Sequence, residues 1–146
     1  MDIRALKRTL TEDEGTRLTV YTDTEGCLTV GRGHRVLPED GLGVGDRIAL
    51  WTCLQFLHDD IAIALTDCRV LFDHFEALPE TAQQVLANMA FNLGKGRLAK
   101  FVKLRSAVAR QDWTQAAAEM RNSKWATQVK GRAERLAIRM ESLAHA

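Results

Sequence analysis

The sequence predicts an α+β fold that is mostly helical, in which a small β-hairpin lobe and a helical lobe are joined by one long helix. Three patterns predict this fold class. Apolar and polar residues alternate around residues 17–33, which is typical of strands. Apolar residues keep helical spacing over residues 47–67, the longest such stretch in the chain. The pattern after Pro79 is helical throughout.

A short helix is predicted at the amino terminus. Ile3, Leu6 and Leu10 follow a 3.6-residue period, which favours a helix over residues 2–13. Gly15 is expected to end it, because glycine is common just after a helix.

A hairpin is predicted over residues 17–33. Its turn lies at residues 22–26, a run rich in turn-forming side chains. Residues 36–45 follow as a loop that holds glycines at alternate positions near its end.

The long helix is predicted to begin at Arg47 with Asp46 as its N-cap, because an aspartate side chain can accept from the first free backbone N–H groups. Pro79 is expected at a first helical position, where its missing N–H costs nothing. Further helices are predicted at residues 80–93, 97–109, 112–121 and 131–143. In the helix predicted at residues 97–109, the apolar residues expected to face the core are Leu98, Phe101, Val102, Leu104 and Val108.

Length and composition narrow the class of protein. A chain of 146 residues buries about 70% of its unfolded surface, so it needs no metal or disulfide to fold. Apolar residues make up 46% and charged residues 27%, which excludes a disordered chain. Cys27, Cys53 and Cys68 are odd in number and show no C-x-x-C spacing, so free thiols in a reducing compartment are expected. Neither a signal peptide nor an 18-residue apolar run is apparent, and the chain is expected not to export itself.

The formal net charge of +1 hides an uneven distribution. Residues 1–94 carry 8 Lys and Arg against 15 Asp and Glu, whereas residues 95–146 carry 12 against 4. Such asymmetry is compatible with a polyanionic partner, and equally with an ordinary solvated helical surface.

The densest polar signal lies between Glu12 and His34. Glu14 ends a helix, Asp23 lies in the hairpin turn and Thr29 lies on the returning strand. Two carboxyls in different environments are what glycoside hydrolysis requires, one to protonate the leaving oxygen and one to activate water or attack the sugar. Spacing alone leaves a structural role for both open, with Glu14 capping or pairing and Asp23 serving the turn.

Other chemistries lack their motifs. The turn at residues 23–26 has neither the ligand spacing nor the distal glutamate of a calcium loop, and the four histidines lack metal-ligand spacing with the cysteines. Gly31 and Gly33 do not complete a dinucleotide fingerprint, and no G-x-S-x-G is present. The carboxyl-terminal helices are basic, but no helix-turn-helix is apparent and aromatic residues make up only 6% of the chain. Both observations argue against nucleic-acid binding.

Residues 13–34, DEGTRLTVYTDTEGCLTVGRGH, closely resemble the phage-type lysozymes of glycoside hydrolase family 24. The matching pattern is E-G-x-x-L-x-x-Y-x-D-[ST]-x-G-x-x-T-x-G-x-G-H, which is long and specific. The resemblance continues at residues 88–94, at Trp113, and at residues 123–125 and 131–133. It therefore covers nearly the whole chain.

The resemblance implies roles residue by residue. Glu14 matches the general acid, Asp23 its partner carboxylate, and Thr29 the threonine that helps to hold the attacking water. Arg132 matches an arginine that pairs with the catalytic glutamate. The resemblance implies inversion at the anomeric carbon, which requires the carboxyl groups of Glu14 and Asp23 to lie about 6.5–9.5 Å apart so that a water fits between them.

Further positions are implied in supporting roles. His34 matches a histidine paired with an aspartate on the long helix, which by register is Asp60. Glu25, Phe91 and Asn92 match substrate-binding positions. Trp113 and Trp125 are expected in the core rather than as sugar platforms. The segment between His34 and the long helix is shorter than in the T-even prototype and rich in glycine.

The implied fold is lysozyme-like, a single domain over residues 1–146 with an active-site cleft between its lobes. The small lobe would span about 14–58, and the helical lobe about 1–13 and 59–146. The implied activity is that of an endolysin muramidase, which hydrolyses the β-1,4 bond between N-acetylmuramic acid and N-acetylglucosamine in peptidoglycan. A lytic transglycosylase that forms 1,6-anhydro products, and a non-catalytic wall-binding protein on the same scaffold, stay open as alternatives.

The resemblance also implies how the protein works in the cell. It would act as a monomer without metal or organic cofactor, on peptidoglycan and not on nucleic acid. It would stay in the host cytoplasm until a holin-type membrane protein permeabilises the membrane, and would then act in the periplasm on the cell wall.

Overall fold

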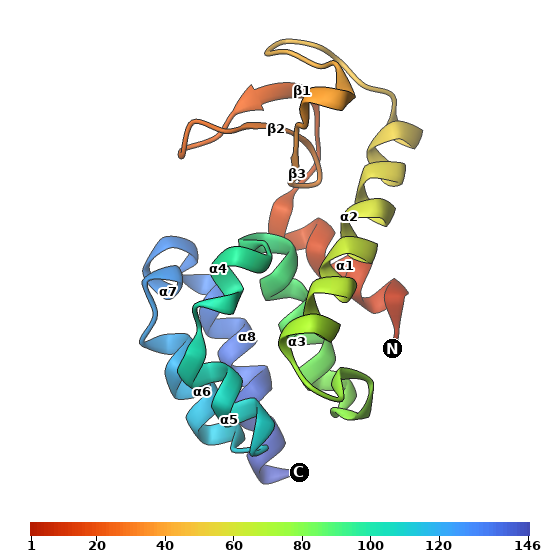
Figure 1. Cartoon of the computed structure of the whole chain (residues 1–146). Coiled ribbons are helices and arrows are strands. Elements are labelled where there is room, and N and C mark those ends of the chain that lie inside the picture. Colours follow the sequence, from red (N-terminus) through yellow and green to blue (C-terminus); the bar gives the residue numbers. More distant parts are fainter. The chain divides into compact units, whose positions relative to one another are not determined.

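The computed structural model describes all residues, 1–146. The helices are α1 (Ile3–Glu14), α2 (Leu50–Leu71), α3 (Glu80–Leu93), α4 (Lys95–Ala99), α5 (Val102–Ala109), α6 (Trp113–Arg121), α7 (Lys124–Val129) and α8 (Gly131–Ser142). The strands are β1 (Arg17–Thr22), β2 (Leu28–Gly31) and β3 (His34–Arg35) (Figure 1). Short 3-10 turns lie at Pro38–Asp40, Phe75–Ala77 and Leu143–His145. The predicted α+β, mostly helical fold class is confirmed.

The chain divides into two compact units. The small unit comprises residues 3–63, and the helical unit comprises residues 1–2 and 64–146. In this division α1 belongs with the strands, whereas the sequence-based lobes placed residues 1–13 with the helices.

The small unit contains an antiparallel sheet with strand order β1-β2-β3. The predicted hairpin is confirmed, with Tyr21 paired to Thr29. A third strand, β3, was not expected, since two residues are too short to show alternation. It pairs with β2 through Val30 and His34. The chain reverses between β2 and β3 because Gly31 and Gly33 both take positive φ, at 69° and 75°.

The predicted start of the long helix is wrong by three residues. The helix α2 begins at Leu50 because the residues before it pair with β1 instead. The Ile48 N–H donates to the Leu18 carbonyl, and the Ile48 side chain joins a buried cluster with Val20. Asp46 is therefore not an N-cap, and its carboxylate accepts from the Gly43 N–H at 2.8 Å.

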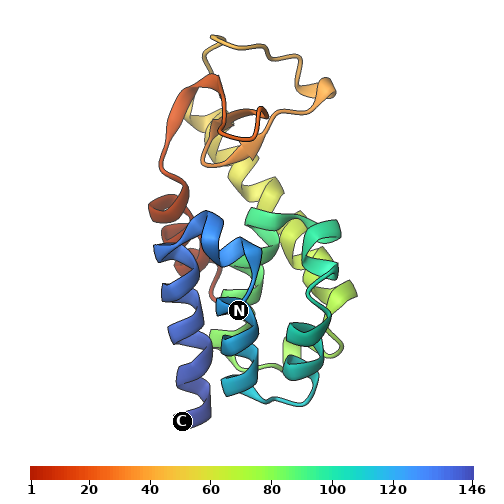
Figure 2. The ribbon, with the colours of Figure 1, turned by 90° about the vertical axis from the view of Figure 1, so that its left-hand side faces the viewer.

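In the helical unit, α3 is buried on almost every face, and α6 packs against both α5 and α8. Figure 2 shows α5 in teal beside α6 and α8 in blue. The caps of two helices follow elementary rules. The Asp112 side chain accepts from the Gln115 N–H at the start of α6, and Ser123 accepts from the Ala126 N–H at the start of α7.

Four points of the sequence-based prediction for the helical unit need correction. The helix expected at residues 97–109 is broken at Phe101, whose ψ of 60° is not helical, so α4 and α5 are separate. Val102, expected in the core, is 67% exposed because the break turns it outward. The helix α7 was missed, and Pro79 is the N-cap residue of α3 rather than its first residue.

Several side chains lie as expected. Trp113 and Trp125 are buried, and all three cysteines are free, with Cys53 and Cys68 both on α2. Burial raises the pKa of the Cys68 thiol to about 12. None of the helices is both long and apolar enough to span a membrane.

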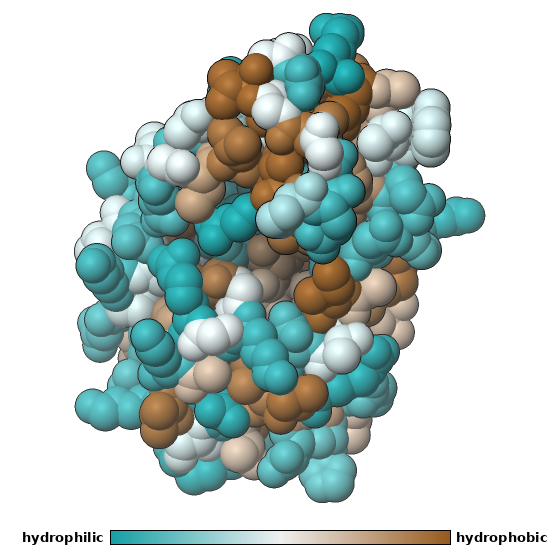
Figure 3. Space-filling view, turned by 45° about the horizontal axis from the view of Figure 1, so that its top comes forward, coloured by the Kyte–Doolittle hydropathy of each residue, from teal (hydrophilic) through white to brown (hydrophobic).

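The surface of the small unit carries exposed apolar side chains. Figure 3 shows apolar surface gathered at the top of that view. Five of the large hydrophobic residues exposed in this unit fall within one stretch of sequence: Leu37, Val44, Leu50, Trp51 and Leu54. The remaining one, Ile63, lies at the end of the unit.

Candidate functional site

Glu14, the last residue of α1, packs against a glycine of the second hairpin turn. A Cβ atom placed on Gly33 would lie 2.3 Å from Glu14 Oε2 and 2.6 Å from Glu14 Cδ. Only a residue without a side chain leaves room for the carboxyl in this position. The half-buried Glu14 carboxyl is therefore seated directly on the backbone of the β2–β3 turn.

Asp23 lies just after β1 and closes the first hairpin turn. Its Oδ1 accepts two backbone hydrogen bonds, from the Glu25 N–H at 2.9 Å and from the Cys27 N–H at 2.8 Å. Its own N–H donates to the Cys27 carbonyl at 2.8 Å. This arrangement orients the carboxylate and engages only one of its two oxygens.

Thr29, on β2, is anchored to the same residue as Asp23. Its hydroxyl donates to the Cys27 carbonyl at 3.2 Å, and the side chain is buried. Because the hydroxyl proton is used in this bond, the oxygen lone pairs are left to accept from another donor. The backbone of Cys27 thus binds both side chains, the Asp23 carboxylate through its N–H and the Thr29 hydroxyl through its carbonyl.

His34 binds two carboxylates. Its Nδ1 lies 2.7 Å from Asp60 Oδ2, the contact that the resemblance implied, and its Nε2 lies 2.8 Å from Asp40 Oδ2. The ring also stacks on Phe56, with centroids 3.9 Å apart. A neutral imidazole has only one N–H, so both bonds can be donated only by the protonated ring.

The electrostatics of this cluster agree with its geometry. Burial opposes the charge on His34, but the hydrogen bonds and charges of Asp60 and Asp40 outweigh it and raise the pKa of His34. Burial also opposes the charge on Asp40, but hydrogen bonds from His34 and the Leu37 N–H lower its pKa overall. The cluster ties α2 and the loop at residues 36–45 to the start of β3.

The helical unit holds the remaining predicted positions. Arg132, at the start of α8, is buried, and its Nε donates to Asn88 Oδ1 on α3 at 3.0 Å. The Asn92 Oδ1 accepts from the Trp125 indole N–H at 2.7 Å, and Phe91 beside it is half-buried. No cluster of His, Cys, Asp or Glu side chains in the structure is arranged to hold a metal ion.

Two expectations concern residues of different units. The expected pairing of Arg132 with Glu14 would join the helical unit to the small unit, and it stays a prediction, as does the expected cleft. Glu25 lies exposed in the hairpin turn, where its backbone N–H binds Asp23. Its contact with substrate also stays a prediction.

Sequence reasoning missed four contributors to the site: Cys27, Gly33, Asp40 and Asn88. Cys27 acts through its backbone, which leaves no trace in its residue type. The motif contains Gly33, but the sequence does not reveal which side chain the glycine admits. Asp40 lies only six residues after His34 in a loop after β3, and a sequence search for a second carboxylate near this histidine would have found it.

Comparison with known proteins agrees with the motif. The model of the phage lysozyme family matches residues 11–141. The pre-baseplate central spike protein of Enterobacteria phage T4 is 30% identical over 150 residues, which cover 88% of this chain and 26% of that protein. A probable T4-type lysozyme of Dictyostelium discoideum is 27% identical over 156 residues, covering 92% of each chain.

A peptidoglycan hydrolase of Pseudomonas phage phiKMV is 31% identical over 139 residues, which cover 95% of this chain and 15% of that protein. This chain thus spans a minor part of the two phage relatives and nearly the full length of the Dictyostelium protein. Since the family match covers most of the residues, including Glu14, Asp23, Thr29 and Arg132, the chain belongs to the phage lysozyme family.

Proposed function

We propose that this protein is a glycoside hydrolase of the bacterial cell wall. It cleaves the β-1,4 bond between N-acetylmuramic acid and N-acetylglucosamine in peptidoglycan. Glu14 protonates the glycosidic oxygen, and Asp23 with Thr29 positions the attacking water. The observation that carries the proposal is the anchoring of both Asp23 and Thr29 on the backbone of Cys27, which fixes each side chain while leaving each with an oxygen lone pair that can accept from water.

The acid side of the reaction rests on Glu14. General acid catalysis requires a carboxyl held in one place, since proton transfer depends on the position of the donor. The close approach of Glu14 to Gly33 supports this role, because the glycine backbone restricts where the carboxyl can lie.

The water side rests on Asp23 and Thr29. With Asp23 Oδ1 held by two backbone N–H groups, Oδ2 can accept a proton from water. With its own proton donated to the Cys27 carbonyl, the Thr29 hydroxyl can accept a hydrogen bond from the other O–H group of that water, while only Asp23 takes up a proton. Held in this way, a water is oriented with a lone pair available for attack on the anomeric carbon.

The products of digestion test the reaction type. Purified protein is incubated with peptidoglycan, and the soluble fragments are analysed by mass spectrometry. A hydrolase adds water and leaves reducing N-acetylmuramic acid ends. Fragments ending in 1,6-anhydro sugars would instead indicate a transglycosylase, and the absence of fragments would indicate a non-catalytic binding protein.

Asp23→Asn is expected to keep the turn but lose the reaction. The asparagine Oδ1 can still accept from the Glu25 and Cys27 N–H groups, whereas its amide nitrogen replaces an acceptor with a donor. Peptidoglycan clearance should fall about 10²–10⁴-fold, the usual contribution of a positioned acid or base. The control is Asp46→Asn, an exposed loop aspartate that also accepts a backbone N–H. Equal loss in both variants would remove Asp23 from the mechanism.

Gly33→Ala is expected to displace Glu14. The new Cβ would clash with the carboxyl, and a misplacement of about 1 Å can cost about 10²-fold in rate. The control is Gly41→Ala, because Gly41 has a similar positive φ of 66° with open space around it. In both variants a Cβ is added to a residue with left-handed backbone, so the free energy of unfolding should fall by about 1–2 kcal/mol. Only Gly33→Ala should also lower kcat. A similar kcat in both variants would contradict the seating of Glu14 on Gly33.

The proposal extends to host lysis. A holin-type membrane protein would give the enzyme access from the host cytoplasm to the wall. Cells that produce this protein together with a holin should therefore lyse, whereas cells that produce it together with an inactive holin should not. Lysis that is independent of the holin would reject this route.

A further inference from the structure

The amino-terminal part of α2 carries an apolar face that the small unit leaves uncovered. One stripe of this helix contains, at spacings of four, three and four residues, Leu50, Leu54, Leu57 and Ile61. The last two are buried, each 3% exposed, whereas Leu50 is 52% exposed and Leu54 is 44% exposed. The apolar stripe therefore extends beyond the core of the small unit by about one helical turn.

Trp51 widens this exposed face. Its side chain is 73% exposed, more than any other large hydrophobic side chain of the protein, and it neighbours Leu54 at a spacing of three residues. We call Leu50, Trp51 and Leu54 the α2 patch. Leu37 and Val44, from the loop before α2, add exposed apolar surface to the same unit, and Figure 3 shows apolar surface gathered there. Tryptophan is enriched at protein interfaces, so its exposure here marks a contact surface.

The charges around the α2 patch are balanced. The exposed charged residues between positions 35 and 54 comprise two of each sign: Arg35, Glu39, Asp46 and Arg47. Neither arginine forms an ion pair within the chain. No lysine occurs from residue 8 to residue 94. An anionic lipid surface attracts an excess of Lys and Arg, which this surface lacks, so its charge does not favour a membrane as the partner.

We propose that the α2 patch is the contact surface between two copies of this chain, related by a two-fold axis. In such a dimer the same surface is used twice, so it must be complementary to itself. A balanced set of charges around an apolar centre meets this condition, because an arginine of each copy can pair with an acidic side chain of the other. A surface of one sign would repel its own copy.

The exposed area agrees with this partner. The α2 patch presents roughly 300–400 Å² of apolar side chain, a size at which the largest apolar patch of a single chain is often functional. Two copies face to face, with the loop residues and the charged rim included, would bury roughly 1,000 Å², the lower limit for a specific interface. An interface of this size predicts a reversible dimer, with single chains present at low concentration.

The dimer goes beyond the proposed hydrolysis and departs from the monomer that the family resemblance implies. None of the residues assigned to bond cleavage lies in the α2 patch. Association through this surface therefore leaves those residues unchanged.

Sedimentation velocity of the purified protein, from low to high micromolar concentration, tests the dimer. The mass should rise reversibly from that of one chain to that of two and then stay constant, because a two-fold contact is closed. Tryptophan emission should move to shorter wavelength over the same range, since the Trp51 indole leaves water while Trp113 and Trp125 are already buried. Growth to larger species without a plateau would indicate aggregation and would reject the proposal.

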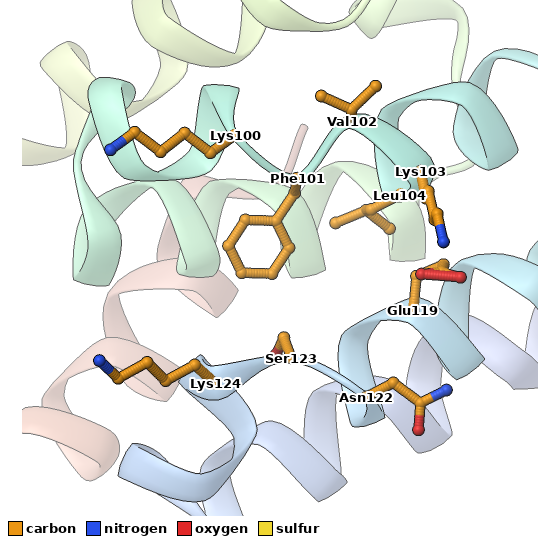
Figure 4. A pocket seen from close by; sticks show the side chains of 9 residues that line it. All are labelled: Lys100, Phe101, Val102, Lys103, Leu104, Glu119, Asn122, Ser123 and Lys124. Atoms are coloured by element: carbon orange, nitrogen blue, oxygen red, sulfur yellow. The ribbon is translucent and has the colours of Figure 1, made fainter.

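Matched variants locate the contact. Trp51→Glu should raise the dimer Kd at least about tenfold, because it removes an aromatic anchor and brings two like charges together. Leu50→Gln adds no charge and should also weaken the dimer. The control is Val102→Glu, which changes a side chain that is 67% exposed at the α4–α5 connection of the helical unit (Figure 4). It should leave the Kd unchanged, and circular dichroism shows whether each variant is folded.

Three results would overturn the dimer. The first is the mass of a single chain at every concentration, and the second is an equal change of Kd in Trp51→Glu and Val102→Glu. The third is binding of the single chain to phospholipid vesicles, anionic or neutral, that Trp51→Glu abolishes, because it would assign the α2 patch to a membrane. None of these measurements uses peptidoglycan, so a failure of the dimer and a failure of the proposed hydrolysis are distinguished.

Discussion

Glu14→Gln is expected to lower peptidoglycan hydrolysis about 10²–10⁴-fold while the protein stays folded. Glutamine has nearly the same shape as glutamate, so it fits against Gly33, but it has no proton to give to the glycosidic oxygen. Circular dichroism and thermal unfolding should match those of the wild type. The turbidity of permeabilised Gram-negative cells measures the activity.

The matched control is Glu12→Gln, which changes an exposed glutamate on the same helix two residues earlier. It should keep wild-type activity, since only its formal charge differs. Near wild-type clearance by Glu14→Gln would mean that another group protonates the leaving oxygen. A loss of activity in Glu12→Gln equal to that in Glu14→Gln would mean that the effect comes from the charge of α1.

His34→Asn is expected to destabilise the protein by about 3 kcal/mol at pH 5–6, since the change leaves two carboxylates without their shared partner. His34 is buried, and its two partners are mostly buried, so water replaces the lost bonds only in part. The stacking on Phe56 is also lost. Urea unfolding measures the difference, with His58→Asn on the exposed face of α2 as the control.

The loss should depend on pH with a definite sign. The pKa of His34 is raised in the folded protein, so its contribution is fully present below its ordinary pKa of about 6.5 and is lost as the pH rises through the raised value. The pKa of Asp40 is lowered, so its contribution is present above about 3.8 and is lost as the pH falls through the lowered value.

The free-energy difference between wild type and His34→Asn should therefore be largest near pH 5–6 and should shrink toward alkaline pH. His58→Asn should leave the free energy of unfolding near that of the wild type, because that side chain is exposed and forms none of the ion pairs of the chain. A difference that is constant from pH 5 to pH 10 would show that His34 acts only by packing.

Local patterns could be predicted from the sequence because their partners are close along the chain. The turn that holds Asp23 spans residues 23–27, and all its hydrogen bonds join residues at most four apart. Turn-forming residue types at these positions therefore predict the turn itself. The hairpin and the helix over residues 80–93 were predicted for the same reason.

Predictions failed where a distant contact overrode a local preference. Asp46 has the residue type of an N-cap, yet the neighbouring Ile48 pairs with β1 and delays the start of α2 to Leu50. The spacing of Leu50, Trp51 and Leu54 is helical, yet these side chains are exposed. Periodicity reveals that a helix has an apolar face but not whether the fold covers it.

The sequence by itself determined the family, the fold class and the residues to which a glycosidase role could be assigned, because a long motif of fixed residue types carries that information. Only the tertiary structure decided how those residues are held. Glu14 rests on Gly33, His34 joins Asp40 to Asp60, and Arg132 is bound by Asn88 from 44 residues away. Such contacts depend on which surfaces of the fold pack together. Local sequence patterns do not reveal that packing, because the partners lie far apart along the chain.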